Sequence, residues 1–316
     1  EPSNFKAVNL DLKVEDLRCD INDLYSLKKI FIKRKPDFVF HLAAQALVSD
    51  AYNNPFNSFN TNGIGTLNVL ECLKELDNKC IAIFITSDKC YLNKEWIWGY
   101  RETDELGGFD PYSGSKGVAE LIIRSYFHSF FNSKDSPIKL GIGRAGNVIG
   151  GGDWAKNRIV PDMVKSWSRN TKLILRNPNA TRPWQHVLEP LSGYLRLAER
   201  LYQSNQLNGE AFNFGPSSDV EFSVLDLVKE MSNHWAKVEW SIDQSLKSNK
   251  HESQLLKLNC DKALAKLIWK PTMIFSETVK MTSEWYKTFY QEPYNSLNCS
   301  LHQITEYQKL LVERSI

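Results

Sequence analysis

Short apolar runs alternate with stretches of helical periodicity through the first half of the chain. Residues 38–44 (FVFHLAA) and 81–87 (IAIFITS) are almost uniformly apolar, which is typical of strands buried on both faces of a parallel sheet. Residues 138–145 (IKLGIGRA) follow the same pattern more weakly. Between these runs, 55–76 and 112–131 carry apolar side chains at helical spacing. The order strand, helix, strand, helix, strand predicts right-handed crossovers and a doubly wound, Rossmann-like α/β sheet.

The same reading predicts further elements on both sides of this region. Upstream, 17–21 (LRCDI) is expected to form a strand and 23–34 the helix that follows it. Downstream, 188–203 is expected to form a helix that returns to the sheet domain. Short strands are also expected at 173–179, 184–187, 210–215 and 237–242.

The regular alternation of apolar runs and helical stretches ends after about residue 146. A glycine-rich loop, GNVIGGGDW (146–154), is followed by short helices, proline-rich loops and isolated strands. We therefore expect a smaller mixed α/β domain that binds the substrate at the carboxyl edge of the sheet. The predicted division gives the dinucleotide-binding domain residues 1–146 and 187–213, and the substrate domain residues 147–186 and 214–316.

Composition narrows the class of protein without identifying it. The 316 residues are 42% hydrophobic and 24% charged with a formal net charge of +2, so neither a nucleic-acid nor a membrane partner is expected. The six cysteines show neither CxxC pairs nor the His/Cys spacing of a metal site. This usage predicts reduced thiols in a cytoplasmic protein without a bound metal.

Tyr112 and Lys116 lie four residues apart in DPYSGSKGVAE (110–120), and a helix would place both on one face. A phenol has a pKa near ~10, and a neighbouring ammonium is expected to lower that pKa toward the range of general acid–base chemistry. Spacing alone does not decide the matter, because the chain has a second Tyr-x-x-x-Lys at Tyr25 and Lys29. We expect that second pair to be a surface feature.

Polar clusters at the predicted strand ends distinguish the two pairs. HLAAQ (41–45), TSDK (86–89) and RAGN (144–147) each end a predicted strand, and Tyr112 and Lys116 open the helix that follows the second of them. Ligands of open α/β sheets bind beyond the carboxyl ends of the strands. These groups are therefore expected to converge on one site, with Tyr112 and Lys116 as its catalytic pair.

Taken together, these segments resemble a known family. HLAAQ, TSDK, YSGSK and RAGNVIGGGDW are similar, in this order, to the extended short-chain dehydrogenase/reductases that act on nucleotide sugars. Within that family, 86–116 and RPWQHVLEPLSGYL (182–195) resemble the 4,6-dehydratases, and the likeness extends over about residues 15–290. The resemblance implies NAD as the cofactor and CDP-glucose as the substrate.

The reaction implied by the resemblance is an internal oxidation followed by an elimination. Tyr112, as a phenolate supported by Lys116, would take the proton from the sugar O4 while a hydride leaves C4 for NAD. Water would then leave across C5 and C6, and the hydride would return to C6 to give a 4-keto-6-deoxy sugar. Ser87 matches the hydroxyl that binds O4, and Asp88 matches the acid that protonates the departing hydroxyl. Lys89 replaces the Glu of related dTDP-glucose enzymes, and its role stays open between C5 base and stabiliser of the enolate.

The resemblance also assigns binding residues. For the cofactor they are Asp20 and Ile21 around the adenine, Ala43, Ala44 and Gln45 near the ribose and phosphate, and Thr61 and Thr86, with Tyr112 and Lys116, at the nicotinamide half. For the nucleotide sugar they are Asn147, Arg158, Arg176, Arg182 and Asn213. Arginine suits a diphosphate because its planar fork forms two parallel charge-assisted hydrogen bonds.

Two further expectations come with the family. Its members open with a strand and a glycine-rich turn that holds the cofactor pyrophosphate at a helix N-terminus, and we expect this segment to be absent from this chain. They also dimerise through a four-helix bundle. Residues 55–76 and 112–131 are therefore expected to pair with a second subunit, in a homodimer or a dimer of dimers.

Alternatives from two classes stay open. A nucleotide-sugar 4-epimerase, or another NDP-sugar 4,6-dehydratase, would use the same Tyr and Lys, although an epimerase has no need for an acid at Asp88. A binding module without catalytic activity would not need the set Ser87, Asp88, Lys89, Tyr112 and Lys116 that this chain retains.

Overall fold

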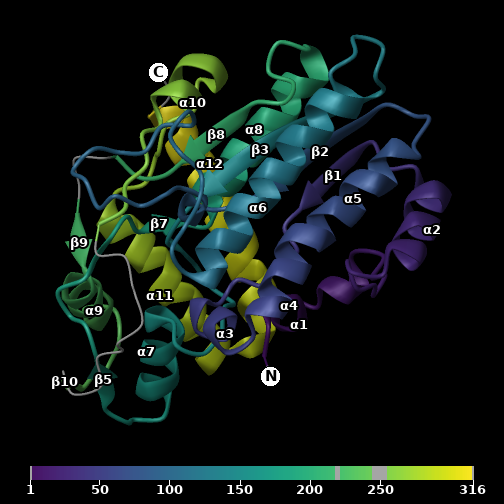
Figure 1. Cartoon of the computed structure of the whole chain (residues 1–316). Helices are drawn as coiled ribbons and strands as arrows, with labels where there is room; N and C mark the ends of the chain where they lie inside the picture. The colour runs from purple at the N-terminus through teal and green to yellow at the C-terminus, as the bar shows by residue number, and fades with distance from the viewer. Residues whose placement is uncertain (1, 218–220, 244–254, 315–316) are drawn as a thin grey trace.

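A four-stranded parallel sheet forms the centre of the molecule (Figure 1). The computed structural model describes residues 2–217, 221–243 and 255–314. The strands lie side by side in the order β1 (Phe38–His41), β2 (Cys80–Ile85), β3 (Ile138–Ala145) and β8 (Ala211–Phe214). Every neighbouring pair is parallel, as the apolar runs predicted. β2 and β3 are buried along most of their length, which explains their continuous apolar sequence.

Helices cover both faces of this sheet (Figure 1). On one face, a buried apolar core joins the sheet to α2 (Leu24–Arg34), α5 (Gly65–Lys74) and α6 (Pro111–Tyr126). On the other face, a second core joins it to α8 (Leu188–Gln203) and α10 (Asp261–Leu267). The predicted helices at 23–34 and 188–203 and the doubly wound arrangement are confirmed.

The two long helices predicted in the first half each contain a π-helical turn. The first consists of α4 (Pro55–Phe59), the turn η2 (Asn60–Ile64) and α5. The second is α6 followed by the turn η4 (Phe127–Phe131). A π turn adds a residue to the helical turn and is frequent at functional sites. In η2 it accompanies the burial of Asn62, whose contacts are described with the site.

No strand forms at 17–21, so that prediction is wrong. The Asp20 carbonyl accepts a hydrogen bond from the Asp23 N–H (2.9 Å), and this turn leads directly into α2. A short strand is stable only when it has a neighbour to hydrogen-bond with. Within the described residues β1 pairs with β2 alone, and the segment instead supplies the start of a helix.

The second half of the chain builds a smaller unit, seen below and to the left of the sheet in Figure 1. Four tryptophans, Trp154, Trp167, Trp184 and Trp285, contribute to its separate buried core. Its elements are β4 (Val148–Ile149), α7 (Ile159–Ser168), β5 (Leu173–Leu175), β6 (Thr181–Arg182), β7 (Gln185–His186), β9 (Phe222–Ser223), α9 (Val224–Ser232), β10 (Trp240–Ile242), α11 (Phe275–Gln291) and α12 (Ser296–Glu313). The short strands expected there are confirmed as β5, β7 and β10, and 210–215 joins the main sheet as β8. No helix within the described ranges has the length and apolar character needed to cross a membrane.

The packing departs from the predicted domain division at two places. Val8, just after α1 (Asn4–Ala7), is buried in the core of the smaller unit, although the prediction assigns it to the sheet domain. Conversely, α10 and Trp269 are buried against the sheet, although the prediction assigns them to the substrate domain. Burial of apolar side chains decides which core a segment joins, and position along the chain does not.

Gly143 of β3 sets how closely α8 approaches the sheet. A Cβ at this position would lie 2.6 Å from the Tyr194 ring. We predict that Gly143→Ala lowers the free energy of unfolding by about 1–3 kcal/mol, because the buried ring must shift to admit the methyl group. In Gly215→Ala, the matched control, the new Cβ would lie 3.5 Å from Leu258 Cβ, which is an ordinary contact. Urea denaturation measures both variants, and equal losses of stability would contradict this account of the packing.

Candidate active site

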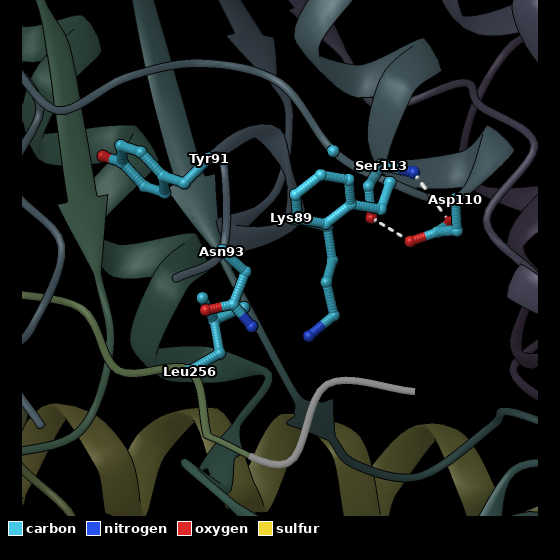
Figure 2. Close-up of a pocket in the computed structure, with 8 residues that line it drawn as sticks. Lys89, Tyr91, Asn93, Asp110, Ser113 and Leu256 are labelled. Atoms are coloured by element: carbon cyan, nitrogen blue, oxygen red, sulfur yellow. Dashed lines mark hydrogen bonds between the residues drawn. The ribbon is translucent and has the colours of Figure 1, made fainter. Parts of the chain in front are cut away.

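The start of α6 presents Tyr112 and Lys116 toward the end of β2. Asp110 caps the helix, because its Oδ1 accepts hydrogen bonds from the N–H groups of Tyr112 and Ser113, both at 3.0 Å. Figure 2 shows the bond from Ser113. Pro111 occupies the first helical turn, where its missing N–H costs nothing. Tyr112 and Lys116 then follow on the buried face, 8% and 6% exposed. The sequence DPYSGSK thus fixes the positions of Tyr112 and Lys116 at the start of the helix.

Ser87, Asp88 and Lys89 meet Tyr112 at the carboxyl end of β2. Ser87 Oγ accepts a hydrogen bond from the Lys89 N–H (3.2 Å), which caps the short helix η3 (Asp88–Cys90), and donates to Asp88 Oδ1 (2.9 Å). The same side chain hydrogen-bonds to Tyr112. Lys89 Nζ lies 3.7 Å from Asp88 Oδ2. The structure therefore brings together four of the predicted catalytic residues around one serine hydroxyl.

Lys116 lies one helical turn further into the protein. Burial lowers the pKa of Lys116 to about 8, while the neighbouring Cys90 and Glu120 oppose this shift. Burial, and then the charge of Lys116, lower the pKa of His41 at the end of β1 to about 4. At neutral pH the lysine therefore keeps its proton and the histidine is uncharged.

Burial raises the pKa of Tyr112 to about 12, so the prediction that this pKa is lowered is wrong for this structure. The hydrogen bond with Ser87 opposes the rise, Asp88 adds to it, and the charge of Arg158 opposes it. Loss of water around a phenol disfavours the phenolate, and here that effect outweighs the nearby positive charge.

Two open hollows adjoin this cluster. The Lys89 hollow has a volume of about 270 Å³, and Figure 2 shows the Lys89 amine extending into it. It is lined by Lys89, Tyr91, Asn93, Gly108, Phe109, Asp110, Ser113 and Leu256. The Arg182 hollow, of about 210 Å³, is lined by Thr181, Arg182, Pro183, Glu221, Leu255, Leu256 and Lys257. Leu256 borders both, so the two hollows are neighbours.

Gly146, just after β3, leaves room for the Asp88 carboxyl group. A Cβ on Gly146 would lie 2.2 Å from Asp88 Oδ2. This oxygen is buried and has no hydrogen-bond partner among the described residues, since Lys89 Nζ is too distant for a hydrogen bond. Asp88 Oδ2 is thus an acceptor, or when protonated a donor, that the protein leaves available.

The predicted cofactor residues after β1 form a turn that is tied to α6. Asn62 Oδ1 accepts from the Gln45 N–H (2.8 Å), and Asn62 Nδ2 donates to the Gln45 carbonyl (3.0 Å) and to Ser115 Oγ (2.8 Å). Ala43 is exposed and Ala44 half-buried, so the backbone of the turn can be approached closely. Gln45 Oε1 is buried and has no partner in the described part of the chain.

The remaining predicted cofactor residues differ in their surroundings. Thr86 is buried, and its hydroxyl donates to Glu120 Oε1 (2.5 Å). Thr61 is half-buried on η2. Asp20 is exposed in the turn before α2, and Ile21 packs against the first residue of α5. Thr61 and the residue that Ile21 contacts therefore lie on the same helical segment.

The predicted substrate arginines occupy different places on the smaller unit. Arg158 donates to Asp153 Oδ2 (2.9 Å) and to the Ala46 carbonyl (3.4 Å), and so bridges the smaller unit and the turn after β1. Arg182 lines the hollow named after it. Arg176 is exposed and lines neither hollow.

The two predicted substrate asparagines differ in how their side chains are held. Asn213 is fully buried, and its Oδ1 accepts from Tyr91 OH (2.8 Å) while its Nδ2 donates to the carbonyls of Tyr100 (2.8 Å) and Asn259 (3.1 Å). A side chain engaged in this way has no polar group left for a ligand, so the geometry favours a structural role over the predicted contact. Asn147 is half-buried with a φ of 50°, in the turn between β3 and β4.

Sequence reasoning missed a buried ion pair beneath the cluster. Arg144 of β3 and Glu120 of α6 are 3% and 2% exposed and share two hydrogen bonds, Nε–Oε1 and Nη2–Oε2, both of 2.8 Å. The signal was present, because Tyr112, Lys116 and Glu120 recur every four residues on the helix face that also carries apolar residues. A carboxylate on a buried face requires a partner.

Comparison with known proteins agrees with the motifs. A family model described as GDP-mannose 4,6 dehydratase matches residues 3–282. The CDP-glucose 4,6-dehydratase of Salmonella typhimurium is 43% identical over 97% of this chain and 86% of its own length.

Solved structures share the fold. UDP-glucose 4-epimerase of Thermotoga maritima with UDP-glucose has a TM-score of 0.73 at 22% identity, over 87% of this chain and 85% of its own. The dTDP-glucose 4,6-dehydratase of Bacillus anthracis, in complex with NAD, has a TM-score of 0.67 at 21% identity, over 89% and 82%. The predicted fold and the resemblance to nucleotide-sugar enzymes are confirmed, and the chain belongs to the GDP-mannose 4,6 dehydratase family.

Proposed function

We propose that this protein converts CDP-glucose to CDP-4-keto-6-deoxyglucose, with NAD as its cofactor. The relative that is 43% identical bears the name of this activity. The observation that carries the proposal is the contact of Ser87 with both Asp88 and Tyr112 at the end of β2. Oxidation at C4 needs a base, whereas loss of water across C5 and C6 also needs an acid beside the same sugar. Asp88 supplies a carboxyl group at that place.

The residues present fit the ribose and phosphate part of the cofactor. Gln45 Oε1 is a buried acceptor without a partner in the described residues, and Ala43 and Ala44 allow a ligand close to the backbone. NAD, when bound, supplies a hydride acceptor that is regenerated within each turnover. Thr61 and Thr86, with Tyr112 and Lys116, would hold the nicotinamide half, and Asp20 and Ile21 the adenine.

Tyr112 is the base that takes the proton from O4. With a pKa of about 12 its phenol holds a proton at neutral pH, so Tyr112 must first release that proton to solvent, and positive charge nearby is needed to stabilise the phenolate. Arg158 supplies part of that charge, and Lys116, whose pKa is about 8, still carries its own at pH 7. The single hydrogen of the Ser87 hydroxyl adds to their effect when it is donated to the phenolate instead of to Asp88 Oδ1.

Asp88 and Lys89 carry the elimination. Ser87 Oγ donates to Asp88 Oδ1 and leaves Oδ2 for the departing C6 hydroxyl group. Lys89 extends into its hollow, where it acts at C5 as a base or as the cation that stabilises the enolate (Figure 2). One serine therefore orients both the base for O4 and the acid for O6.

The nucleotide end of the substrate is assigned to the smaller unit. Arg158, which reaches the turn after β1, and Arg182, which lines its hollow, would bind the diphosphate as planar charged donors. Arg176 and Asn147 would make outer contacts. All six cysteines are free thiols, and we assign the protein to the reducing cytoplasm on that ground.

We also propose that two copies pair through α4, η2 and α6, in a dimer or a dimer of dimers. Phe56, Ile64 and Leu121 are 79%, 45% and 55% exposed on these elements. α4 and η2 both pack along α6, so these side chains belong to one helical layer outside the sheet. The same surface on a second copy would cover them around a two-fold axis.

Incubation with CDP-glucose and NAD tests the function, with NMR identification of the product. A 4-keto-6-deoxy sugar is the expected product. CDP-galactose would identify an epimerase, and no turnover would refute the proposal.

Asp88→Asn is expected to slow product formation about 10²–10⁴-fold while oxidation at C4 persists, because an amide cannot deliver the proton that the leaving hydroxyl needs. Rapid quenching with borohydride should trap a 4-keto sugar that retains its C6 hydroxyl. Tyr112→Phe should show neither species. Asp77→Asn, at the exposed opposite end of β2, is the matched control with an unchanged rate. An unchanged rate in Asp88→Asn would remove the acid role.

Lys116→Met is expected to abolish turnover and yet stabilise the fold. The pKa of Lys116 is about 8 in the folded protein and 10.5 for an ordinary, solvated lysine such as that of the unfolded chain. Burial of the charged amine therefore destabilises the folded state, and this effect is at its full size below pH 8. This effect fades as the pH rises from 8 to 10.5. At pH 7 the free energy of unfolding of the variant should exceed that of the wild type by about 2–3 kcal/mol. This difference should shrink by pH 10.5.

Urea denaturation at both pH values measures that difference. Lys29→Met in the exposed Tyr25–Lys29 pair is the matched control, because Lys29 lies on the surface over the Tyr25 ring, 3.9 Å from its centroid. A Lys116→Met protein that is less stable than the wild type at pH 7 would contradict the electrostatic account.

Leu121→Glu is expected to convert the protein to monomers, since it places a charge at the centre of the proposed interface. Leu195→Glu, equally exposed but on α8 across the sheet, is the control and should leave the pairing intact. Sedimentation velocity separates these outcomes. A wild-type monomer, or a Leu121→Glu protein that still pairs, would refute this interface.

A further inference from the structure

A buried ion pair joins the catalytic helix to the centre of the sheet. Arg144 presents Nε and Nη2 to the two carboxylate oxygens of Glu120 in parallel hydrogen bonds of 2.8 Å. Arg144 Nη1 also donates to Tyr91 OH (2.7 Å) and to the Glu102 carbonyl (3.0 Å). These contacts connect α6, β3 and the 91–102 segment at one point.

The carboxylate of this pair also holds the residue before the catalytic serine. Thr86 Oγ1 donates to Glu120 Oε1 at 2.5 Å, and the Thr86 N–H is fixed in the sheet by the Gly143 carbonyl (2.9 Å). Thr86 is followed directly by Ser87. A single short hydrogen bond therefore makes the position of the residues at the end of β2 depend on the position of Glu120.

Stability alone does not account for the pair. Removing two charges from water costs several kcal/mol per ion, and well-packed apolar residues at such sites are often equally stable or more stable. Both side chains here are almost completely buried. The arrangement needs a reason other than the free energy of folding.

The pair lies one helical turn below the catalytic lysine. Glu120 follows Lys116 by four residues and shares its helix face. The titratable groups that interact with Lys116 are His41 from β1, Cys90 from η3 and Glu120 from its own helix, and Tyr112 lies one turn before it on the same helix. Of these, Glu120 is the carboxylate, so its charge favours the protonated lysine.

We propose that Glu120 and Arg144 are positioning residues of the proposed reaction. Arg144 fixes the Glu120 carboxylate, which in turn fixes the Thr86 hydroxyl at the end of β2 and favours the charged form of Lys116 beside Tyr112. The inference rests on the function proposed above, but it concerns neither the identity of the sugar nor the chemistry of Asp88.

Three variants of the full chain test this role. Glu120→Gln keeps the shape and removes the charge, Arg144→Lys keeps the charge and removes the fork, and Glu120→Met combined with Arg144→Met replaces the pair by apolar side chains. In the double variant we expect wild-type stability within the precision of urea denaturation. We expect its kcat to fall about 10- to 100-fold, with KM for CDP-glucose little changed.

The pH profile separates positioning from a merely structural role. Glu120 raises the pKa of Lys116 against the effect of burial, so its removal lowers that pKa further. The alkaline limb of kcat should therefore move to lower pH in Glu120→Gln and in the double variant. In Arg144→Lys the limb should stay in place while kcat falls.

Glu277→Gln is the matched control. Glu277 forms a comparable double hydrogen bond with Arg314 (2.7 and 2.8 Å) in the smaller unit. It should lose stability without any change in kcat or pH profile. A folded double variant with wild-type kcat and pH profile would overturn the inference. Failure of the wild type to act on CDP-glucose would instead refute the proposed function.

Discussion

The site depends on one constraint, which is the packing of α6 against the carboxyl end of β2. This packing turns every fourth residue of the helix toward the strand. Tyr112, Lys116 and Glu120 recur at that period, and each meets a different group of the sheet. Tyr112 meets Ser87, and Glu120 meets Thr86 and Arg144. The Asp110 cap fixes where the period begins. A shift of the helix by one residue would turn all three side chains away from the strand.

The same packing places charged groups where water cannot reach them. Burial raises the pKa of Tyr112 and lowers those of Lys116 and His41, because loss of water disfavours the charged form of each group. The protein offsets this with Arg158 and Glu120, whose charges act on the tyrosine and the lysine respectively. Perturbed pKa values of this kind cluster at functional sites, because catalysis requires groups that are not fully solvated.

Elements with a strong local signal could be predicted from the sequence, and features set by tertiary environment could not. The apolar runs predicted the strands β1 to β3. The motifs at the strand ends predicted that Ser87 and Tyr112 lie close together. The strand at 17–21 failed because strand formation depends on a partner, which a local pattern does not reveal. The pKa of Tyr112 came out in the wrong direction because burial depends on the whole fold. The resemblance assigns Asn213 to the substrate, but its contacts are decided by segments distant in sequence.

The central claim is that one sugar carbon is oxidised so that a neighbouring carbon can lose water at the same site. CDP-glucose carrying deuterium at C4 tests this claim most directly, because the label follows the hydrogen removed from that carbon. The account predicts that mass spectrometry and NMR find the deuterium at C6 of a 4-keto-6-deoxy product from the wild-type protein. Deuterium retained at C4, in the substrate or in its epimer, would contradict the account.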